Sequence, residues 1–264
     1  MTLPYDLFAL LYAETGARAE CENMMGGSPS APGDRLAYYV WLARRGDELW
    51  LVDTGFGAEA AARRGRNLLA RPARMLERLG IAPAQITNVV LTHLHYDHAG
   101  TMADFPYATF HLQAREAAFA TGPAMCHAAI RHGYEVEDVV AFVRRLYADR
   151  VRFHDGDAEL APGLSLHAVP GHTPGLQVVR VATARGHVLL ASDATHFYAN
   201  FQRGTVFPVV VEPVGVLEGY RRLLALADTP DHIVPGHDPR VAQIYPAVAE
   251  GIVRLDVAPA AGWH

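Results

Sequence analysis

The sequence predicts a mixed α/β domain built from layers of strands and helices. Short apolar runs rich in β-branched residues recur along the chain, and each is bounded by Gly, Pro or Asp. Segments with a helical spacing of apolar residues lie between these runs. Apolar residues make up 50% of the 264 residues, which is enough to bury a large core. This combination of strands and helices is typical of layered α/β folds.

Eight apolar runs are predicted to be strands, and several are continuous enough to be buried on both faces of a sheet. In chain order they are LAYYVWLA (36–43), ELWLVDTG (48–55), ITNVVLTH (86–93), ATFHLQ (108–113), LSLHAVPGH (164–172), LQVVRVA (176–182), HVLLASDA (187–194) and DHIVPGHD (231–238).

Four helical patterns separate these strands, at 58–80, 113–122, 126–149 and 214–227. Gly80 and Pro83 mark the end of the first pattern, as expected for a helix C-terminus. The helices within about 113–149 form an insert between two halves of the chain, and it could serve as a lid, a dimer surface or outer-layer packing. The chain has no linker or low-complexity tract, so residues 1–264 are predicted to form one domain with this insert.

Charge and cysteine content exclude several classes of protein. The chain has 23 basic and 28 acidic residues, a net charge of −5, which argues against a nucleic-acid binder. Cys21 and Cys126 are too few for a disulfide framework and fit a reducing compartment. The first residues do not have a secretory leader pattern, and no apolar stretch reaches membrane-spanning length. We therefore expect a cytoplasmic protein without a membrane partner.

The segment LTHLHYDHAG (91–100) concentrates metal-binding side chains directly after an apolar run. His93 and His95 are two positions apart, so an extended backbone points them to the same side. Asp97 and His98 follow as the chain turns, which allows them to face a second ion close by. One tetrahedral catalytic ion would leave these two residues without a role.

Three further apolar runs also end in a metal-binding residue. His172 follows LHAVPG, Asp193 follows VLLAS, and His237 follows HIVPG. Side chains at strand ends are held by a rigid scaffold while remaining accessible. The resulting seven ligands suit two ions that share a bridging carboxylate and a bridging water. Imidazole nitrogens and carboxylate oxygens without a thiolate favour Zn²⁺, with Mn²⁺, Fe²⁺ or Co²⁺ as alternatives.

HLHYDH, together with the downstream PGHTPG, SDAT and PGHD segments and the upstream VDTG, resembles the metallo-β-lactamase superfamily. Within it, the spacing is most similar to the N-acyl homoserine lactonase group. The resemblance extends from about residue 36 to 240. It implies a four-layer αββα sandwich with a dinuclear zinc site at one edge.

The resemblance also implies a role for each ligand. His93, His95 and His172 would hold one metal, Asp97, His98 and His237 the other, and Asp193 would bridge them. Asp53 in VDTG matches a carboxylate that orients the site histidines.

One position departs from the lactonase pattern. That group often has a tyrosine three residues after the bridging aspartate, aimed at the substrate carbonyl. Here His196 occupies this position, and Tyr198 follows two residues later. Either His196 or Tyr198 therefore donates to the carbonyl oxygen, or the substrate differs from that of the lactonase group. Asp97 or Asp193 is expected to carry the proton to the leaving oxygen. Four further residues are predicted either to line an apolar substrate pocket or to fill the core, namely Met24, Met25, Phe197 and Phe201.

The function expected from these features is hydrolysis of a small lactone, such as an N-acyl homoserine lactone, by a hydroxide held between two zinc ions. Hydrolysis of another cyclic amide or ester, as in a β-lactam or a catabolic intermediate, is the main alternative. A thioester hydrolase is less favoured because few residues follow His237 to form a helical thioester-binding domain. The sequence is compatible with a monomer or a homodimer.

Overall fold

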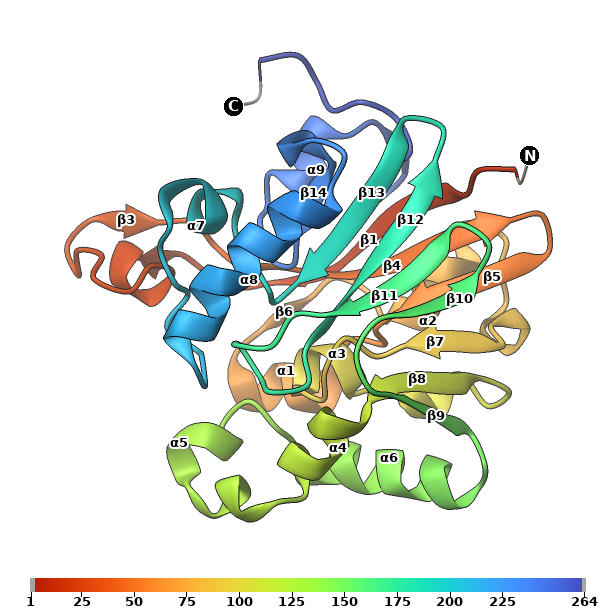
Figure 1. Ribbon diagram of the computed structural model, residues 1–264, viewed down its shortest axis with the longest axis horizontal. Helices are drawn as coiled ribbons and strands as arrows, with labels where there is room; N and C mark the ends of the chain where they lie inside the picture. Colours follow the sequence, from red (N-terminus) through yellow and green to blue (C-terminus); the bar gives the residue numbers. More distant parts are fainter. Residues whose placement is uncertain (1–2, 263–264) are drawn as a thin grey trace.

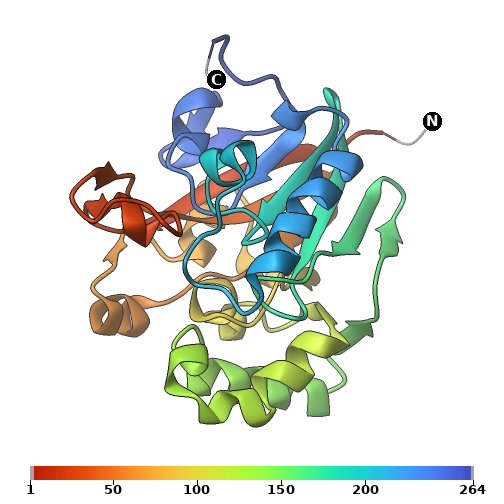
Figure 2. The same cartoon turned by 60° about the vertical axis from the view of Figure 1, so that its left-hand side comes forward.

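The computed structural model describes residues 3–262 and consists of two β-sheets packed face to face, with helices covering the outer faces (Figure 1). This arrangement confirms the mixed α/β class and the four-layer αββα sandwich. A view rotated by 60° shows the same layers and places α8 against the second sheet (Figure 2).

The first sheet is formed largely by the first half of the chain. Its main path has the order β15 (Ala247–Ala249), β16 (Ile252–Arg254), β1 (Asp6–Glu14), β4 (Ala37–Arg45), β5 (Glu48–Val52), β7 (Asn88–Val90), β8 (Thr109–Gln113) and β9 (Val151–His154). The short strand β6 (Asn67–Leu68) pairs with the end of β1. Strands β5, β7, β8 and β9 run parallel to one another, so their carboxyl ends lie at the same edge.

The second sheet has the order β10 (Ala158–Ala161), β11 (Leu164–Ala168), β12 (Gln177–Thr183), β13 (Gly186–Ser192) and β14 (Ile233–Pro235). Strands β11 and β13 are both antiparallel to β12, and β14 is parallel to β13. Strands β11, β13 and β14 therefore all point in one direction. A separate pair, β2 (Arg18–Ala19) and β3 (Pro32–Gly33), projects beside the sandwich (Figure 1).

The helices are short apart from α6 and α8. They are α1 (Ala58–Arg64), α2 (Pro72–Glu77), α3 (Tyr96–Ala99), α4 (Ala114–Ala120), α5 (Ala128–Arg131), α6 (Val136–Tyr147), α7 (Tyr198–Arg203), α8 (Pro213–Leu226) and α9 (Val241–Ile244). Helices α4, α5 and α6 lie together beside β8 and β9 (Figure 1). Within residues 3–262, no helix combines the length and the apolar composition that crossing a bilayer would require.

Strand alternation divides the buried side chains of the first sheet between two cores. In β4, Tyr39 and Trp41 pack between the sheets, whereas Val40 and Leu42 pack against the helices on the outer face. Because successive strand residues point to opposite faces, a central strand that is apolar throughout contributes side chains to both cores. Helix α8 covers the second sheet through residues three and four apart, including Val216, Tyr220 and Leu223.

The helices differ from the predicted helical patterns in two places. The helix expected over 58–80 is two helices, because Gly65 ends α1 with a left-handed backbone (φ 61°) and Pro72 begins α2. The helical pattern expected over 126–149 is broken around Gly133, between α5 and α6. In addition, the long strand β1 was not predicted, although it lies near the centre of the first sheet.

Candidate metal centre

The strand ends of the two sheets meet at one edge of the sandwich and deliver the predicted ligands there. His93 follows β7 of the first sheet, and Asp193 directly follows β13 of the second. His172 lies in the loop after β11, and His237 lies two residues beyond β14. The matched directions of β11, β13 and β14 bring these loops to the same edge.

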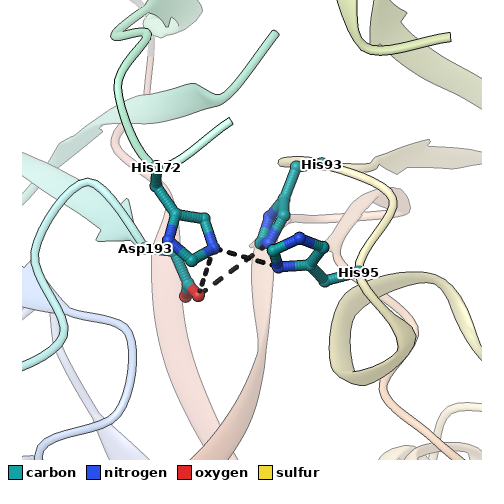
Figure 3. Close-up of side chains that lie close together, drawn as sticks. All are labelled: His93, His95, His172 and Asp193. Atoms are coloured by element: carbon teal, nitrogen blue, oxygen red, sulfur yellow. Dashed lines mark hydrogen bonds and ion pairs between the residues drawn. The ribbon is translucent and has the colours of Figure 1, made fainter. Parts of the chain in front are cut away.

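Four buried side chains form a first group, His93, His95, His172 and Asp193 (Figure 3). One ligand atom from each lies within 4.8 Å of the ligand atoms of the others. His172 Nε2 is 3.0 Å from His95 Nδ1 and 3.1 Å from Asp193 Oδ2. His93 Nε2 is 3.8 Å from the same carboxylate oxygen.

Asp97, His98 and His237 form a second group beside the first. Their ligand atoms also lie within 4.8 Å of one another, and all three side chains are buried. Asp97 Oδ2 is 3.6 Å from His98 Nε2 and 3.7 Å from His237 Nε2.

The two oxygens of Asp193 face different groups. Oδ2 faces His172 and His93, whereas Oδ1 lies 3.2 Å from His98 Nε2 and 2.9 Å from His237 Nε2. A carboxylate in this position can contact two ions at once.

Partners outside the centre fix the tautomers of three histidines. His172 Nδ1 donates to the carbonyl oxygen of Val209 (2.8 Å), and His237 Nδ1 donates to that of Ala37 (3.0 Å). His98 Nδ1 donates to Asp53 Oδ2 (2.7 Å). An imidazole that donates from Nδ1 and is neutral, as a metal ligand must be, carries a lone pair on Nε2, and each of these Nε2 atoms points into the centre. Without a cation, and against the effect of burial, the carboxylates of Asp193, Asp97 and Asp53 raise the pKa of His98 well above its ordinary value.

The centre therefore brings together nitrogen lone pairs and carboxylate oxygens, all of which are electron-pair donors to a bound cation. The Nε2 atom of His93 is buried and has no hydrogen-bond partner among the described residues. Burial, together with neighbouring imidazoles such as His98, lowers the pKa of His93 well below its ordinary value. Burial and His172 do the same for the pKa of His95. Both rings are accordingly neutral at pH 7, as metal ligands must be. This donor set has the composition of a dinuclear metal site.

Asp53 supports the second group through its hydrogen bond with His98. It is fully buried and accepts hydrogen bonds from the Thr92 backbone N–H (2.7 Å) and hydroxyl (2.9 Å) as well as from His98. Its backbone adopts φ 63°, and Ser192, immediately before Asp193, adopts φ 45°. Positive φ values are uncommon for residues other than glycine, and they occur here at the two strand ends that carry the site.

Glu116 on α4 supports both ligand loops, although nothing in its sequence context predicted this role. Its fully buried carboxylate accepts a hydrogen bond from the backbone N–H of Leu94, between His93 and His95 (3.0 Å). It also accepts hydrogen bonds from the hydroxyl of Thr173 (2.6 Å) and from that of Tyr134 (3.0 Å). One side chain of the helical insert thus connects the loops of His95 and His172.

Gly133 brings the insert directly against a predicted ligand. A Cβ atom added to Gly133 would lie 2.4 Å from His95 Nε2, and the Gly133 carbonyl accepts a hydrogen bond from the Tyr96 backbone N–H (2.9 Å). Only a residue without a side chain fits at this distance.

The structure separates the two residues considered as carbonyl donors. His196 lies at the centre, with Nε2 3.1 Å from Asp193 Oδ2 and its ring stacked on Phe207 at a centroid distance of 3.7 Å. Burial lowers the pKa of His196 to about 3, although Asp193 opposes this shift, so the ring is neutral at pH 7. Tyr198 instead begins α7 and packs in the core between the sheets, next to Phe201.

A cleft opens onto the metal centre, and the empty space in it, open solvent included, is about 510 Å³. Of the four residues predicted as its apolar lining, Phe197 and Phe201 are buried in the cores, Met25 is 48% exposed, and Met24 contacts Thr205. None of these four is among the described residues that line the cleft, which supports the alternative that the two phenylalanines are core residues. Tyr198 is also absent from the described lining.

The cleft walls come from residues that the sequence did not single out. Besides the metal centre, they are Arg18, Leu36, Tyr38, Arg64, Arg66, Tyr96, His132, Gly133, Phe207 and Val209. Tyr96 lies inside the HLHYDH motif, so its proximity could have been inferred. Arg64 and Arg66 lie in and just after α1, where the helical pattern gives no indication of which side chains face the site.

An αββα sandwich with paired His/Asp groups at the strand ends defines a metal-dependent hydrolase. Residues 33–237 match the metallo-β-lactamase superfamily, and the chain belongs to that family. It is 29% identical over 237 residues to a probable metallo-hydrolase of Mycobacterium tuberculosis, covering 78% of this chain and 72% of that protein. It is 28% identical over 246 residues to the N-acyl homoserine lactonase AiiA of Bacillus thuringiensis subsp. kurstaki, covering 86% of this chain and 92% of that protein.

The fold has close counterparts among solved structures. A quorum-quenching N-acyl homoserine lactone lactonase superimposes with a TM-score of 0.75 at 25% identity, covering 91% of this chain and 94% of that chain.

Proposed function

We propose that this protein is a dinuclear zinc lactonase that opens the ring of small lactones, with N-acyl homoserine lactones as the first class to test. The observation that carries the proposal is the convergence of histidine ring nitrogens on the two oxygens of Asp193, with His98, His172 and His237 each held by a partner outside the centre. The similarity to proteins named N-acyl homoserine lactonases supports the choice of substrate.

The ligands divide between two ions in this proposal. His93, His95 and His172 would hold one ion, Asp97, His98 and His237 would hold the other, and Asp193 would be shared between them. Donors that are all nitrogen or oxygen suit zinc, although manganese, iron and cobalt use the same atoms. When bound, such a pair of ions lowers the pKa of a shared water and polarises an ester carbonyl.

The remaining steps belong to side chains of this chain. His196 is neutral and lines the cleft, and in the structure its Nε2 faces Asp193 Oδ2. With Asp193 engaged by metal, the single N–H of this ring would be free to donate to the carbonyl oxygen as negative charge develops there. Asp97 has an oxygen facing the centre and lines the cleft, so it can carry a proton to the ring oxygen as that oxygen leaves. The leaving oxygen of a cyclic ester stays attached to the product and therefore remains within reach of Asp97.

The test uses purified protein with quantified metal content against matched panels of lactones, acyclic esters, thioesters and β-lactams, with proton release as the common readout. We expect lactone opening to be the fastest reaction, and Asp97→Asn to lose one metal equivalent together with activity. Hydrolysis of thioesters or β-lactams without lactone opening would overturn the proposed substrate class. Full occupancy by two metals and unchanged ring opening in Asp97→Asn would overturn the ligand assignment.

A further inference from the structure

Arginine side chains lie on two walls of the cleft that leads to the metal centre. Arg66 lies on one wall, where its Nε donates to the Tyr96 hydroxyl (3.1 Å) and its guanidinium carbon is 6.0 Å from the Tyr38 ring centre. Tyr38 in turn packs edge-on against the ring of His237, with centroids 5.1 Å apart. The wall therefore runs from a predicted metal ligand through tyrosine to a guanidinium group.

Arg18 lies on a second wall. Its guanidinium carbon is 5.9 Å from the ring centre of Phe207, which is stacked on His196. Its Nε donates to the Asn23 side chain (2.7 Å), and Nη2 donates to the Glu22 carbonyl (2.7 Å). The only carboxylate near it is that of Glu22, at 3.9 Å from Nη1, among the described residues.

The positive charge of the cleft is only partly neutralised by the chain itself. Arg64 is paired with Glu135 (2.9 Å), but Arg66 has no carboxylate within ion-pair distance among residues 3–262, and its two Nη groups have no acceptor there. The acidic residues that line the cleft are Asp97 and Asp193, which the metal centre uses. A half-buried guanidinium with free donors fits a planar anion, because its N–H groups match carboxylate geometry.

We propose that the cleft takes a substrate that bears a carboxylate in addition to the ester that is cleaved, and that Arg66 binds this carboxylate with support from Arg18. The inference rests on the proposed lactone hydrolysis only for the identity of the cleaved bond. The substrate class is accordingly an acidic lactone rather than one with a purely aliphatic acyl chain. Tyr38 and Phe207 supply the apolar surfaces on which the rest of the molecule lies.

The kinetic test compares lactones that differ only in charge. γ-Butyrolactone-γ-carboxylate is compared with its primary carboxamide, and N-succinyl homoserine lactone with its terminal amide, so that the charge lies near the ring in one pair and far from it in the other. The zinc-loaded wild type should favour at least one acid over its amide by tenfold or more in kcat/KM. Arg66→Gln should reduce that ratio by about 10- to 100-fold.

Two further variants separate charge from general disturbance. Arg66→Lys keeps the charge and should retain part of the preference for the acid. Arg221→Gln removes an exposed arginine on α8 that pairs with Glu218, and it should change neither rate. Equal rates on acid and amide in the wild type, or an unchanged ratio in Arg66→Gln, would overturn the inference.

A binding experiment tests the carboxylate site without turnover. Calorimetry on the zinc-loaded protein compares glutarate with glutaramate, which have the same chain length and differ in whether the second end is charged. Tighter binding of glutarate that is lost in Arg66→Gln supports the carboxylate site even if no lactone is opened, in which case only the proposed reaction fails. Equal binding of the two compounds to the wild type contradicts the inference, whatever the lactone panel shows.

Discussion

Replacement of Asp53 by asparagine should weaken the binding of one metal at the centre without changing the shape of the site. The wild-type carboxylate only accepts hydrogen bonds, and it accepts three of them, from the Thr92 N–H, the Thr92 hydroxyl and His98 Nδ1. Asparagine is nearly isosteric, but one of its two terminal atoms is an NH₂ donor. In either orientation of the amide, its NH₂ group therefore faces at least one of these three donors and cannot accept a hydrogen bond from it.

The magnitude follows from the hydrogen bond to His98. If the amide nitrogen faces this ring, Nδ1 must accept, and Nε2 then carries the proton and loses the lone pair that points at Asp193 and Asp97. If the amide nitrogen faces the Thr92 N–H, a fully buried donor is left unpaired. Loss of a supporting carboxylate typically weakens metal affinity by about 10- to 100-fold. That range corresponds to about 1.4–2.7 kcal/mol.

The assay is competition with a chromophoric chelator at pH 7.5, which resolves the two binding steps. Asp53→Asn should weaken one step, that of the ion held by His98, and leave the other nearly unchanged. Asp47→Asn, at an exposed turn between β4 and β5, is the matched control and should change neither step. If Asp53→Asn binds both equivalents with wild-type affinity, Asp53 does not set the His98 tautomer and the reasoning fails.

Three further changes test other parts of the structure. Gly133→Ala places a methyl group 2.4 Å from His95 Nε2 and should lower metal affinity about tenfold or more. Gly16→Ala, which has open space around it, is the control and should leave metal affinity unchanged. Equal affinities of the two variants in a zinc titration would contradict this contact. His196→Phe should lower kcat about 100-fold and leave metal content unchanged by elemental analysis, and loss of metal would show that this ring is a ligand instead. Burial and a neighbouring imidazole lower the pKa of His111 to about 4, so the folded state favours its neutral form; stability present above pH 6.5 should fall by up to about 3 kcal/mol as the pH drops through 4. His111→Phe should flatten that fall in denaturant titrations at successive pH values, and parallel curves would show that His111 is not responsible.

The clustering of the seven predicted ligands could be inferred from sequence because these residues share a position in the fold. Each follows an apolar run, and strand ends are rigid and meet at sheet edges, so residue type and order were sufficient. The central strand β1 was missed because DLFALLYAE combines Leu, Ala and Glu, which favour helices, with no clear alternation. Pairing with β16 and β4 along its edges and burial of its two faces in the two cores decide the outcome, and both depend on residues far away in the chain.

The walls of the cleft could not be predicted for a related reason. Arg66 and Arg18 are spaced like ordinary surface arginines, and only the packing of separate loops against Tyr38 and Phe207 brings them to one opening. Glu116 similarly resembles an exposed residue of the QAREAAFA helix, yet it is fully buried. For Phe197 and Phe201 the sequence left a core position and a pocket position open, and both side chains lie in the hydrophobic cores.

The contact between Gly133 and His95 makes the helical insert and the metal centre parts of one equilibrium. Binding of the ions should therefore stabilise the packing of α5 and α6 against the sandwich. By reciprocity, packing of the insert should increase metal affinity by the same free energy. Removal of metal should therefore increase hydrogen exchange in residues 126–149 ahead of the sheets. A different insert grafted onto this scaffold would need a glycine at the position of Gly133, because any side chain there would collide with His95.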